Sequence, residues 1–314
     1  MALKDSFTNL KKDLAVAVQD LPNIVKVLQR GFADAETQAG AVDTDISGLK
    51  ADVADIKNVM ADNAGAHNAI YRGKNLGTEV TTAQYDAIEA GTFDDMYIGD
   101  YWEIDSVKWR IAHFDYWLGT GDVECTDHHV VIVPDSNLYN ASMNAEDTTA
   151  GGYYSSAMRG GADYLVENSS ALYEASETIK TNFGASHILI HREILTNAVT
   201  SGNASGWAWY DSSVELMSEV MAYGTPAWTV GGKGFEVGED KSQLALYRHD
   251  ISKLAKRACW LRGISSTSNF AFTNADGYTG SYGASASLGV CPIFAIKGNT
   301  ETRKPIQPND PNER

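Results

Sequence analysis

Apolar residues recur with heptad spacing between residues 42 and 60. Their spacings alternate between four and three residues, which is the pattern of a coiled coil. With Ile46 at an a position, Asp45 and Asp52 occupy g positions. The e positions five residues further along hold Lys50 and Lys57, so the charges fit the ion-pair sites of a parallel coiled coil. The predicted oligomerisation seam consists of Val42, Ile46, Leu49, Val53, Ile56 and Met60.

A second apolar stripe covers residues 3–32 and shifts its register near Leu14. Pro22 predicts the start of a new helix, because proline inside a helix removes a backbone hydrogen bond. We therefore expect two short amphipathic helices, followed by a stalk over 41–62 that spans about 30 Å. The first helices either extend the bundle or dock into a larger assembly, and the sequence leaves both alternatives open. The stripe consists of Leu3, Phe7, Leu10, Leu14, Val18, Leu21, Val25, Leu28 and Phe32.

From Ile70 onward the chain becomes aromatic, glycine-rich and strand-forming. Short strands with a few helices and long loops predict an α+β body. Ser212 and Glu215 form a predicted capping box for a helix that ends before Gly224. The predicted elements are a helix over 82–90, a hairpin over 101–114 turning at Asp105-Ser106, a strand over 129–133, a helix over 170–182, a strand over 187–190, a helix over 212–223, and short strands between 254 and 296.

These changes of pattern divide the chain into four segments. Residues 1–40 are a predicted helical anchor, 41–65 a coiled-coil neck, 66–297 the head and 298–314 a proline-rich tail, whose polar composition predicts an extended or disordered chain. A trimer is favoured over a dimer because Ile56 takes a d position beside β-branched residues at a.

Composition narrows the classes of function. The 314 residues are 43% hydrophobic, which is enough for a sizeable core, where we expect Trp109 and Trp260. A net charge of −16 without a basic run argues against nucleic acid as a partner. No stretch approaches the roughly 18 apolar residues of a membrane helix, so we expect no membrane insertion. Charged residues at 11–13 interrupt any signal-peptide core, so we expect synthesis in a cytoplasm without export by the usual route.

Metal-ligand residue types occur in patterns that do not favour a metal site. His187 and His191 are four residues apart, but on the expected strand this places them about 13 Å apart. Residues 125–129 combine thiol, carboxylate and imidazole groups, which all bind zinc, but a second ligand pair is lacking. We therefore predict no metal and no cofactor. Three widely spaced cysteines resemble no disulfide framework, and we expect buried free thiols. They are Cys125, Cys259 and Cys291.

No catalytic motif stands out. The glycines around Lys233 are not followed by Ser or Thr, so they do not form a phosphate loop. The carboxylate pairs Asp94-Asp95 and Glu239-Asp240 lie in turn-like contexts. Glycan cleavage needs two carboxylates across a cleft, and it stays a weaker alternative. We assign no catalytic residue and expect no enzyme activity.

Two aromatic segments are candidates for ligand binding. Residues 207–210 follow a Ser/Gly-rich stretch that predicts a loop, where rings provide stacking surfaces for sugars. Residues 274–285 mix Tyr with Ser, Gly and Asn, the composition of adaptable binding surfaces. Core packing and turn chemistry explain such residues as well. The candidate ligand-binding residues are Trp207, Trp209, Tyr210, Asn274, Asp276, Tyr278 and Tyr282.

The C-terminal part of the head resembles a known ending. It comprises Trp260-Leu261-Arg262-Gly263, a loop through Tyr282-Gly283-Ala284, and the run 288–294. This resembles the close of a domain of unknown function found in bacterial surface proteins and phage structural proteins, where a Trp-Leu-Arg strand precedes a loop and a Gly-Val-Arg-Pro-Ala-Phe strand. Residues 71–77 and 94–102 also resemble phage structural proteins of this kind.

That ending is similar to C-type-lectin-like folds, so the resemblance implies a lectin-like body over about 70–297 in a trimeric, host-facing virion fibre. The implied display loop spans about 264–288. Cys291 stands where the family pattern has Arg. The calcium-dependent sugar motifs of animal lectins and the cysteine pair of formylglycine-generating enzymes have no clear counterpart, which argues against both activities.

The resulting hypothesis is a bacteriophage head or tail fibre. Residues 1–40 would attach it to other virion proteins, the neck would form a homotrimer, and the head would bind a host or mucosal surface, with a glycan as candidate ligand. Such a protein would be made in the bacterial host cytoplasm and reside in the virion. The alternative is a purely structural capsid or tail decoration protein without receptor binding.

Overall fold

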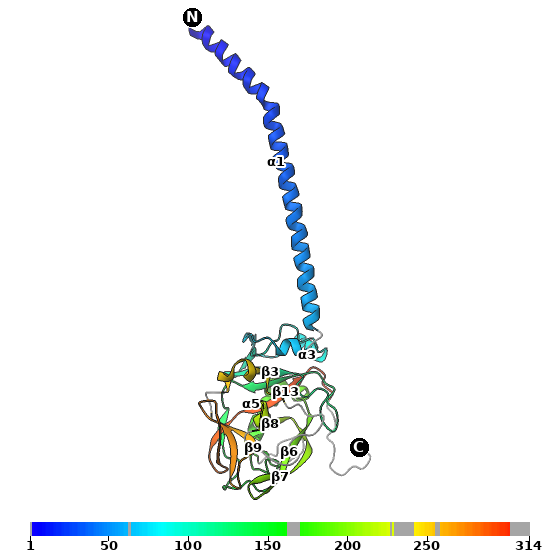
Figure 1. Ribbon diagram of the computed structural model, residues 1–314, viewed down its shortest axis with the longest axis vertical. Helices are drawn as coiled ribbons and strands as arrows, with labels where there is room; N and C mark the ends of the chain where they lie inside the picture. The colour runs from blue at the N-terminus through cyan, green and yellow to red at the C-terminus, as the bar shows by residue number, and fades with distance from the viewer. Residues whose placement is uncertain are drawn as a thin grey trace. The chain divides into compact units, whose positions relative to one another are not determined.

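The computed structural model describes residues 2–61, 64–161, 170–226, 228, 242–254 and 258–301. The chain belongs to the α+β class, as predicted, because an N-terminal helix precedes β-sheets and short helices (Figure 1). It divides into two compact units, Met1–Val59 and Met60–Arg314.

The first unit is one long helix. α1 runs over Ala2–Ala61 and contains Pro22. The predicted break at Pro22, and with it the division into two short helices and a separate stalk, is therefore wrong. Proline removes one backbone hydrogen bond and bends a helix, but the neighbouring turns keep their own bonds. The helix accordingly bends in its N-terminal half (Figure 1).

The second unit is the head, which combines short helices with many short strands. Its helices are α2 (Ala64–Asn68), α3 (Thr82–Glu89), α4 (Tyr173–Phe183), α5 (Glu219–Tyr223) and α6 (Ala245–His249), with 3-10 turns at Ala185–His187 and Ile251–Lys253. Its strands are β1 (Asn75–Gly77), β2 (Tyr101–Ile104), β3 (Val107–Phe114), β4 (His129–Pro134), β5 (Tyr139–Ala141), β6 (His191–Thr200), β7 (Asn203–Ser212), β8 (Val214–Leu216), β9 (Cys259–Ile264), β10 (Asn269–Thr273), β11 (Thr279–Gly283), β12 (Leu288–Val290) and β13 (Pro292–Lys297).

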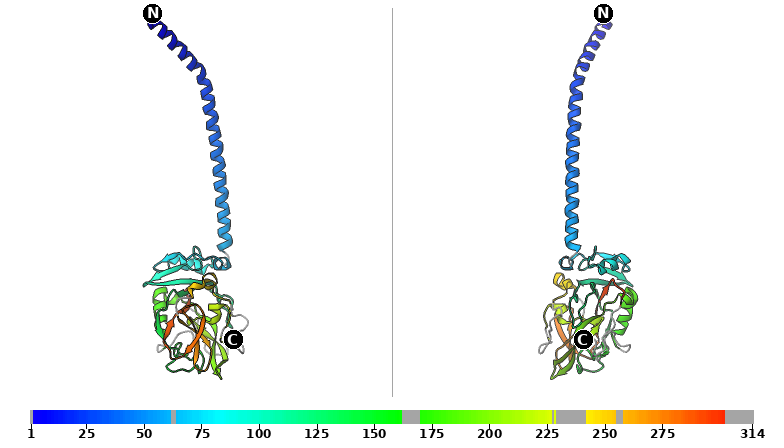
Figure 2. Two further views of the ribbon diagram at one scale, coloured as in Figure 1. Left: turned by 60° about the vertical axis from the view of Figure 1, so that its left-hand side comes forward. Right: turned by 90° about the vertical axis from the view of Figure 1, so that its right-hand side faces the viewer.

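The described part of the head contains three sheets (Figure 2). The first has six strands in the order β1-β2-β3-β4-β13-β8, and the second has five in the order β11-β10-β9-β12-β5. β6 and β7 form a two-stranded ribbon. The last strand, β13, lies antiparallel between β4 and β8. The C-terminal part of the head thus completes the sheet that its first strands begin.

Local signals placed several elements correctly. The helix predicted over 82–90 is α3, where Thr81 Oγ1 accepts a hydrogen bond from the Gln84 N–H at 3.3 Å. Asp105 and Ser106 adopt φ angles of 50° and 65° in the tight turn between β2 and β3, as the predicted hairpin requires. β4 and α4 confirm the strand predicted over 129–133 and the helix predicted over 170–182.

The strand predicted over 187–190 is wrong. His187 ends a 3-10 turn, and its ring stacks on Tyr85 with centroids 3.7 Å apart. Ile188 forms an isolated bridge with Ile296, and β6 begins only at His191. Ile188 and Leu189 are buried, and burial of a short apolar run is possible for a strand and for an extended connection alike.

The start of the helix predicted over 212–223 is also wrong, although its end is confirmed. α5 begins after Ser218, whose Oγ accepts from the Met221 N–H at 3.1 Å. Gly224 ends it with a left-handed conformation, as predicted. Ser212 does donate to Glu215 Oε1 at 2.9 Å, but both residues are buried at the junction of β7 and β8. The two residues therefore form a buried side-chain contact between β7 and β8 and do not cap a helix.

The described apolar residues of the head form two buried clusters. Trp109 belongs to one and Trp260 to the other, and both are fully buried, as predicted. Trp109 packs edge-on against Phe183 and Phe294, with ring centroids 5.7 Å apart in each case. These rings join α4 to β3 and β13 across one face of the six-stranded sheet.

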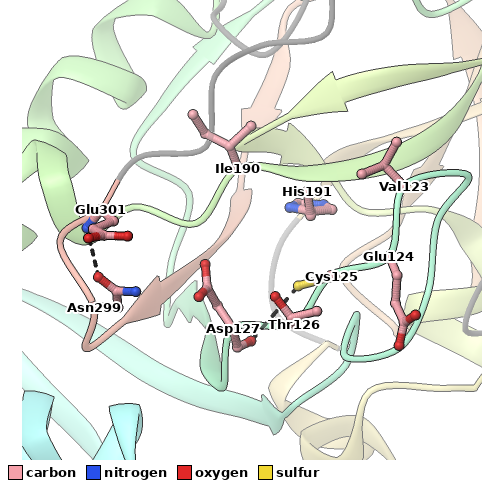
Figure 3. Close-up of a pocket in the computed structure, with 9 residues that line it drawn as sticks. All are labelled: Val123, Glu124, Cys125, Thr126, Asp127, Ile190, His191, Asn299 and Glu301. Carbon is pink, nitrogen blue, oxygen red and sulfur yellow. Dashed lines mark hydrogen bonds between the residues drawn. The ribbon is translucent and has the colours of Figure 1, made fainter. Parts of the chain in front are cut away.

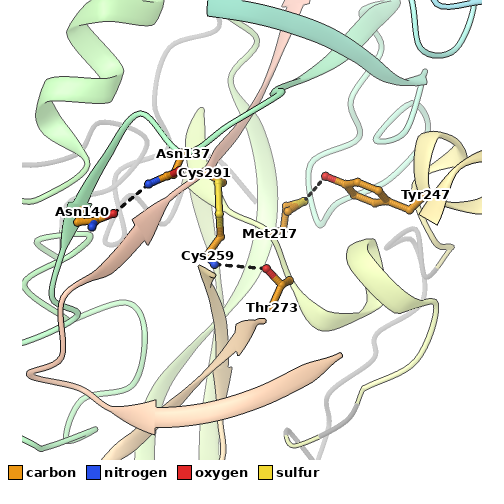
Figure 4. The surroundings of a disulfide bond; sticks show 7 residues. All are labelled: Asn137, Asn140, Met217, Tyr247, Cys259, Thr273 and Cys291. Carbon is orange, nitrogen blue, oxygen red and sulfur yellow. Dashed lines mark hydrogen bonds between the residues drawn. A yellow bond between two sulfur atoms is a disulfide. The ribbon is translucent and has the colours of Figure 1, made fainter. Parts of the chain in front are cut away.

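Cys259 and Cys291 form a buried disulfide (Figure 4). The expectation of free thiols is therefore wrong for this pair. Cys259 begins β9 and Cys291 directly follows β12, and these two strands are neighbours in the five-stranded sheet. Residues 32 positions apart in the chain thus have Cα atoms only 6.0 Å apart. Cys125 is buried and takes no part in this bond.

Some sequence-based predictions concern residues outside the described ranges. They are the glycine-rich loop around Lys233, the carboxylate pair Glu239-Asp240 and the tail beyond residue 301.

Candidate functional site

The β10–β11 hairpin presents two exposed tyrosines. Tyr278 is 71% exposed and Tyr282 is 55% exposed. Tyr282 pairs with Phe270, while the Asn274 N–H donates to the carbonyl oxygen of Tyr278 at 2.8 Å. Side chains two residues apart on a strand share a face. Both tyrosines therefore lie on the face that also carries Phe272, at the outer edge of the described five-stranded sheet.

Gly280 leaves room for an aromatic ring between these two tyrosines. A Cβ atom at this position would come within 2.6 Å of Phe272 Cε1. The Phe272 ring lies edge-on to Tyr282, with centroids 6.1 Å apart. Phe272, Tyr278 and Tyr282 form what we name the aromatic strip, whose two tyrosines are about 13 Å apart along the strand.

The turn of the hairpin is held by one side chain. Asn274 Oδ1 accepts from the N–H groups of Asp276 and Tyr278, at 3.0 and 2.8 Å. Gly277 has a φ of 84°, a conformation that side chains disfavour. Asn274 thus shapes the turn and positions Tyr278, while Asp276 is exposed. The display loop predicted over 264–288 is wrong as a single loop, because it contains this ordered hairpin.

Trp228 extends the aromatic surface and was missed by the sequence analysis. It is 38% exposed, and its Nε1 donates to Thr279 Oγ1 at 3.3 Å, where β11 begins. Its backbone N–H donates to Glu219 Oε2 at 3.1 Å. A lone Trp between Ala and Thr residues carries no periodic signal, so only the fold brings it to the hairpin.

The second predicted aromatic segment lies in a strand, and the Ser/Gly-rich approach that was predicted to be a loop is a loop only at its start, because β7 begins at Asn203. Ser201 and Gly202, with φ angles of 51° and 81°, make the tight turn from β6 into β7. Tyr210 stacks on Tyr154 at 3.9 Å between centroids and packs against the core. Trp207 and Trp209 share the other face of β7 and are half-buried. This segment thus lies on the β6–β7 ribbon, whereas the aromatic strip lies on the five-stranded sheet.

A buried ion pair joins the β6–β7 ribbon to the five-stranded sheet. Glu193 on β6 binds Arg262 on β9, within the Trp-Leu-Arg segment. Glu193 also accepts from Trp117 Nε1 at 3.1 Å, and His191 Nε2 lies 3.8 Å from it. Burial alone raises the pKa of Glu193, but Arg262 and His191 together lower it to about 2. The carboxylate is therefore ionised at neutral pH.

Two buried histidines are neutral. His129 Nε2 accepts from the Trp117 N–H at 3.0 Å, so its Nδ1 carries the proton and donates to the Asp127 carbonyl oxygen at 2.8 Å. His113 Nδ1 accepts from the Ala245 N–H at 3.1 Å. Burial lowers the pKa of His129 to about 4 and the pKa of His113 to about 3.

Mild acid is expected to destabilise the head. Both histidines titrate at about 6.5 in the unfolded chain and lower in the fold. The unfolded state therefore binds more protons below pH 6.5, and stability falls as the pH falls from there towards 4. Between pH 6.5 and 5.5 the free energy of unfolding should fall by about 1 kcal/mol for each histidine.

Denaturant unfolding at these two pH values measures the effect. The amide of H113Q can still accept the Ala245 bond but does not titrate, so this variant should lose about half as much stability as the parent. An equal loss in the two proteins would contradict the prediction.

A pocket of about 310 Å³ lies between residues 123–127 and β6 (Figure 3). Its lining includes Asp127, whose Oδ2 accepts from Lys297 Nζ at 2.9 Å. His128 instead faces Asp115, 2.7 Å from Nδ1 to Oδ2. The ligand types noted over 125–129 thus have separate partners, and the described residues contain no cluster arranged to hold a metal ion. The described lining also lacks Tyr, Trp and Phe, so it does not resemble an aromatic-lined glycan cleft.

No family model matches the chain, and comparisons with curated proteins and with solved structures find no match either. None of the helices described here combines the length and apolarity needed to cross a membrane. The function must therefore be inferred from the chain's own residues and their arrangement.

Proposed function

We propose that this protein is a bacteriophage virion fibre whose oligomeric helical stalk carries a head that binds a host or mucosal surface. The observation that carries the proposal is the aromatic strip, whose two tyrosines are exposed on an ordered hairpin. The ligand class that suits it is a glycan, because tyrosine rings offer an apolar face and a polar hydroxyl to the same partner. Catalysis is not part of the proposal.

The proposed stalk is a homotrimer made in the bacterial host cytoplasm and built into the virion. Its support is the exposure of Val42, Ile46, Leu49 and Val53, all on the predicted seam. Helices with such a seam gain stability by packing against one another. Several heads on one stalk would turn weak single-site binding into avidity. The N-terminal end of the helix would attach to other virion proteins.

The proposed head fold is C-type-lectin-like. In support, the Trp-Leu-Arg segment lies in β9, and the run 288–294 lies in β12 and the start of β13. The β10–β11 hairpin lies between these two segments in the chain. Cys291, which stands where the family pattern has Arg, is held by its bond to Cys259. A covalent link therefore occupies the place of any ion pair made by that Arg.

The test of adhesion is a screen of the full-length protein against bacterial and mucosal glycans. We expect binding to at least one glycan class. Y278A and Y282A should each weaken that binding about tenfold or more, because truncating a central ring costs about 1.4 kcal/mol or more. Y278F keeps the ring and is the matched control, with binding near that of the parent. Binding unaffected by Y278A and Y282A would contradict a role for the aromatic strip.

A purely structural decoration protein is the second candidate. The observation favouring it is that Tyr210 packs against the core and that Trp207 and Trp209 are half-buried, so only the hairpin presents exposed tyrosines among the predicted ligand-binding residues. Decoration predicts no response on the glycan screen. It also predicts that imaging of the assembled particle shows the aromatic strip covered by neighbouring virion proteins.

A further inference from the structure

The continuity of α1 more than doubles the length of the apolar seam. The register that places Ile46 at a can be followed towards the N-terminus through a helix that does not break. The alternation of three and four residues then persists through Val18 to Leu14, where the register shifts, and Ala35 and Ala39 occupy the layers between the two stripes. At 1.5 Å per residue the seam over 18–60 spans about 65 Å. Its added members are Val18, Leu21, Val25, Leu28, Phe32, Ala35 and Ala39.

The residues that disfavour a helix all lie outside this seam. Pro22 takes an e position, Gly31 a g position, Gly40 a b position and Gly48 a c position. None of them removes an apolar side chain from a or d. If these four residues were distributed without regard to the seam, at least one of them would be expected at an a or d position.

The added members are exposed in the single chain. Val18, Leu21, Val25, Leu28 and Phe32 are 44–70% exposed, which matches the 43–64% of the seam residues at 42–53. Large apolar side chains aligned on one stripe mark a surface that a partner covers. Helix and register both continue from the 42–60 seam, where Asp45 and Lys50 take the g and e positions that form ion pairs between the helices of a parallel coiled coil. A further copy of this chain is therefore the partner that fits.

We propose that α1 forms one continuous coiled coil between copies of this chain over the whole of residues 18–60. This rests on the proposed stalk and changes its anchor. Residues 18–40 belong to the self-association surface, and only the helix before the register shift, with Leu3, Phe7 and Leu10, is left to bind another virion protein. Ala35 and Ala39 make the weakest layers, because they bury the least apolar surface.

Two valines allow a matched test in the full-length protein. Val25 is at a, whereas Val27 is at c, and both are exposed in the single helix. V25D should weaken association at least tenfold and lower the melting temperature of the helical signal. V27D makes the same chemical change off the seam and should leave both near the parent values. Light scattering measures the molar mass and thus the association, and circular dichroism during heating measures the melting temperature. V53D serves as the reference for the 42–60 seam.

The outcomes separate this inference from the proposed fibre. If V25D behaves like V27D while V53D dissociates, the long seam is overturned and the short stalk stands. If the parent itself is monomeric, both the long seam and the proposed stalk are overturned. If V25D and V53D weaken association and V27D does not, the seam from 18 to 60 is supported, and the mass of the parent gives the number of copies.

Discussion

Replacing Glu193 by glutamine is expected to lower the free energy of unfolding of the head by about 3–5 kcal/mol. The substitution keeps the shape of the side chain but removes the charge that faces Arg262. The substitution would therefore take the Glu193 carboxylate away from a buried cation, since both residues are at least nine-tenths buried. Removing one member of a buried pair costs far more than the pair contributes as a whole.

The control for this experiment is E177Q. Glu177 pairs with Lys180 at 2.7 Å on α4, where the Glu177 side chain is 49% exposed, so its loss should cost at most about 1 kcal/mol. E193Q/R262Q removes both charges and should recover part of the loss. Chemical denaturation measures the free energy of unfolding of the parent and of each variant. Similar values for E193Q and E177Q would contradict the importance of the buried pair.

The pH dependence provides a second readout of the same pair. A carboxylate with a pKa of about 2 in the fold contributes stability above about pH 4.5, the value for an unperturbed glutamate. That contribution is lost as the pH falls from 4.5 towards 2. The difference between the parent and E193Q should therefore shrink over this range. A purely steric effect of the substitution would not change with pH in this way.

Removing the disulfide in C259A/C291A is expected to cost about 3.5–4 kcal/mol, or roughly 10 °C in melting temperature. The bond closes a loop of 32 residues in sequence separation and thereby limits the freedom of the unfolded chain. It also joins β9 to the junction between β12, in the five-stranded sheet, and β13, in the six-stranded sheet. Its loss should therefore loosen the contact between the two sheets.

A reducing agent separates the bond from the packing of the cysteines. It should lower the melting temperature of the parent but leave that of C259A/C291A unchanged. Thiol titration of the unfolded, unreduced chain should detect one thiol, from Cys125, and three after reduction. Three thiols before reduction would show that the bond does not form in the protein as isolated.

The hairpin residues were predicted from composition, but their arrangement was not. Tyr278 and Tyr282 stood out because they lie among turn-forming Asn, Asp and Gly residues. The pairing of Phe272 with Gly280 depends on strand register, which an isolated segment does not specify. Trp207 and Trp209 were predicted in or beside a turn because a Ser/Gly-rich stretch precedes them. They lie on β7 because the buried partner strand β6 overrides weak local preference.

The sequence by itself determined the α+β class, the capped helix α3, the β2–β3 hairpin and the apolar stripes of α1, because each depends on side chains close together in the chain. Only the tertiary structure decided that Ser212 and Glu215 are buried between two strands and that Cys259 bonds Cys291, while the continuity of α1 through Pro22 is a property of the helix that the sequence pattern did not reveal. Local signals act over about one helical turn or one tight turn, so they identify elements and mark candidate caps. Contacts between distant strands pair residues by burial and register, and these are properties of the whole fold.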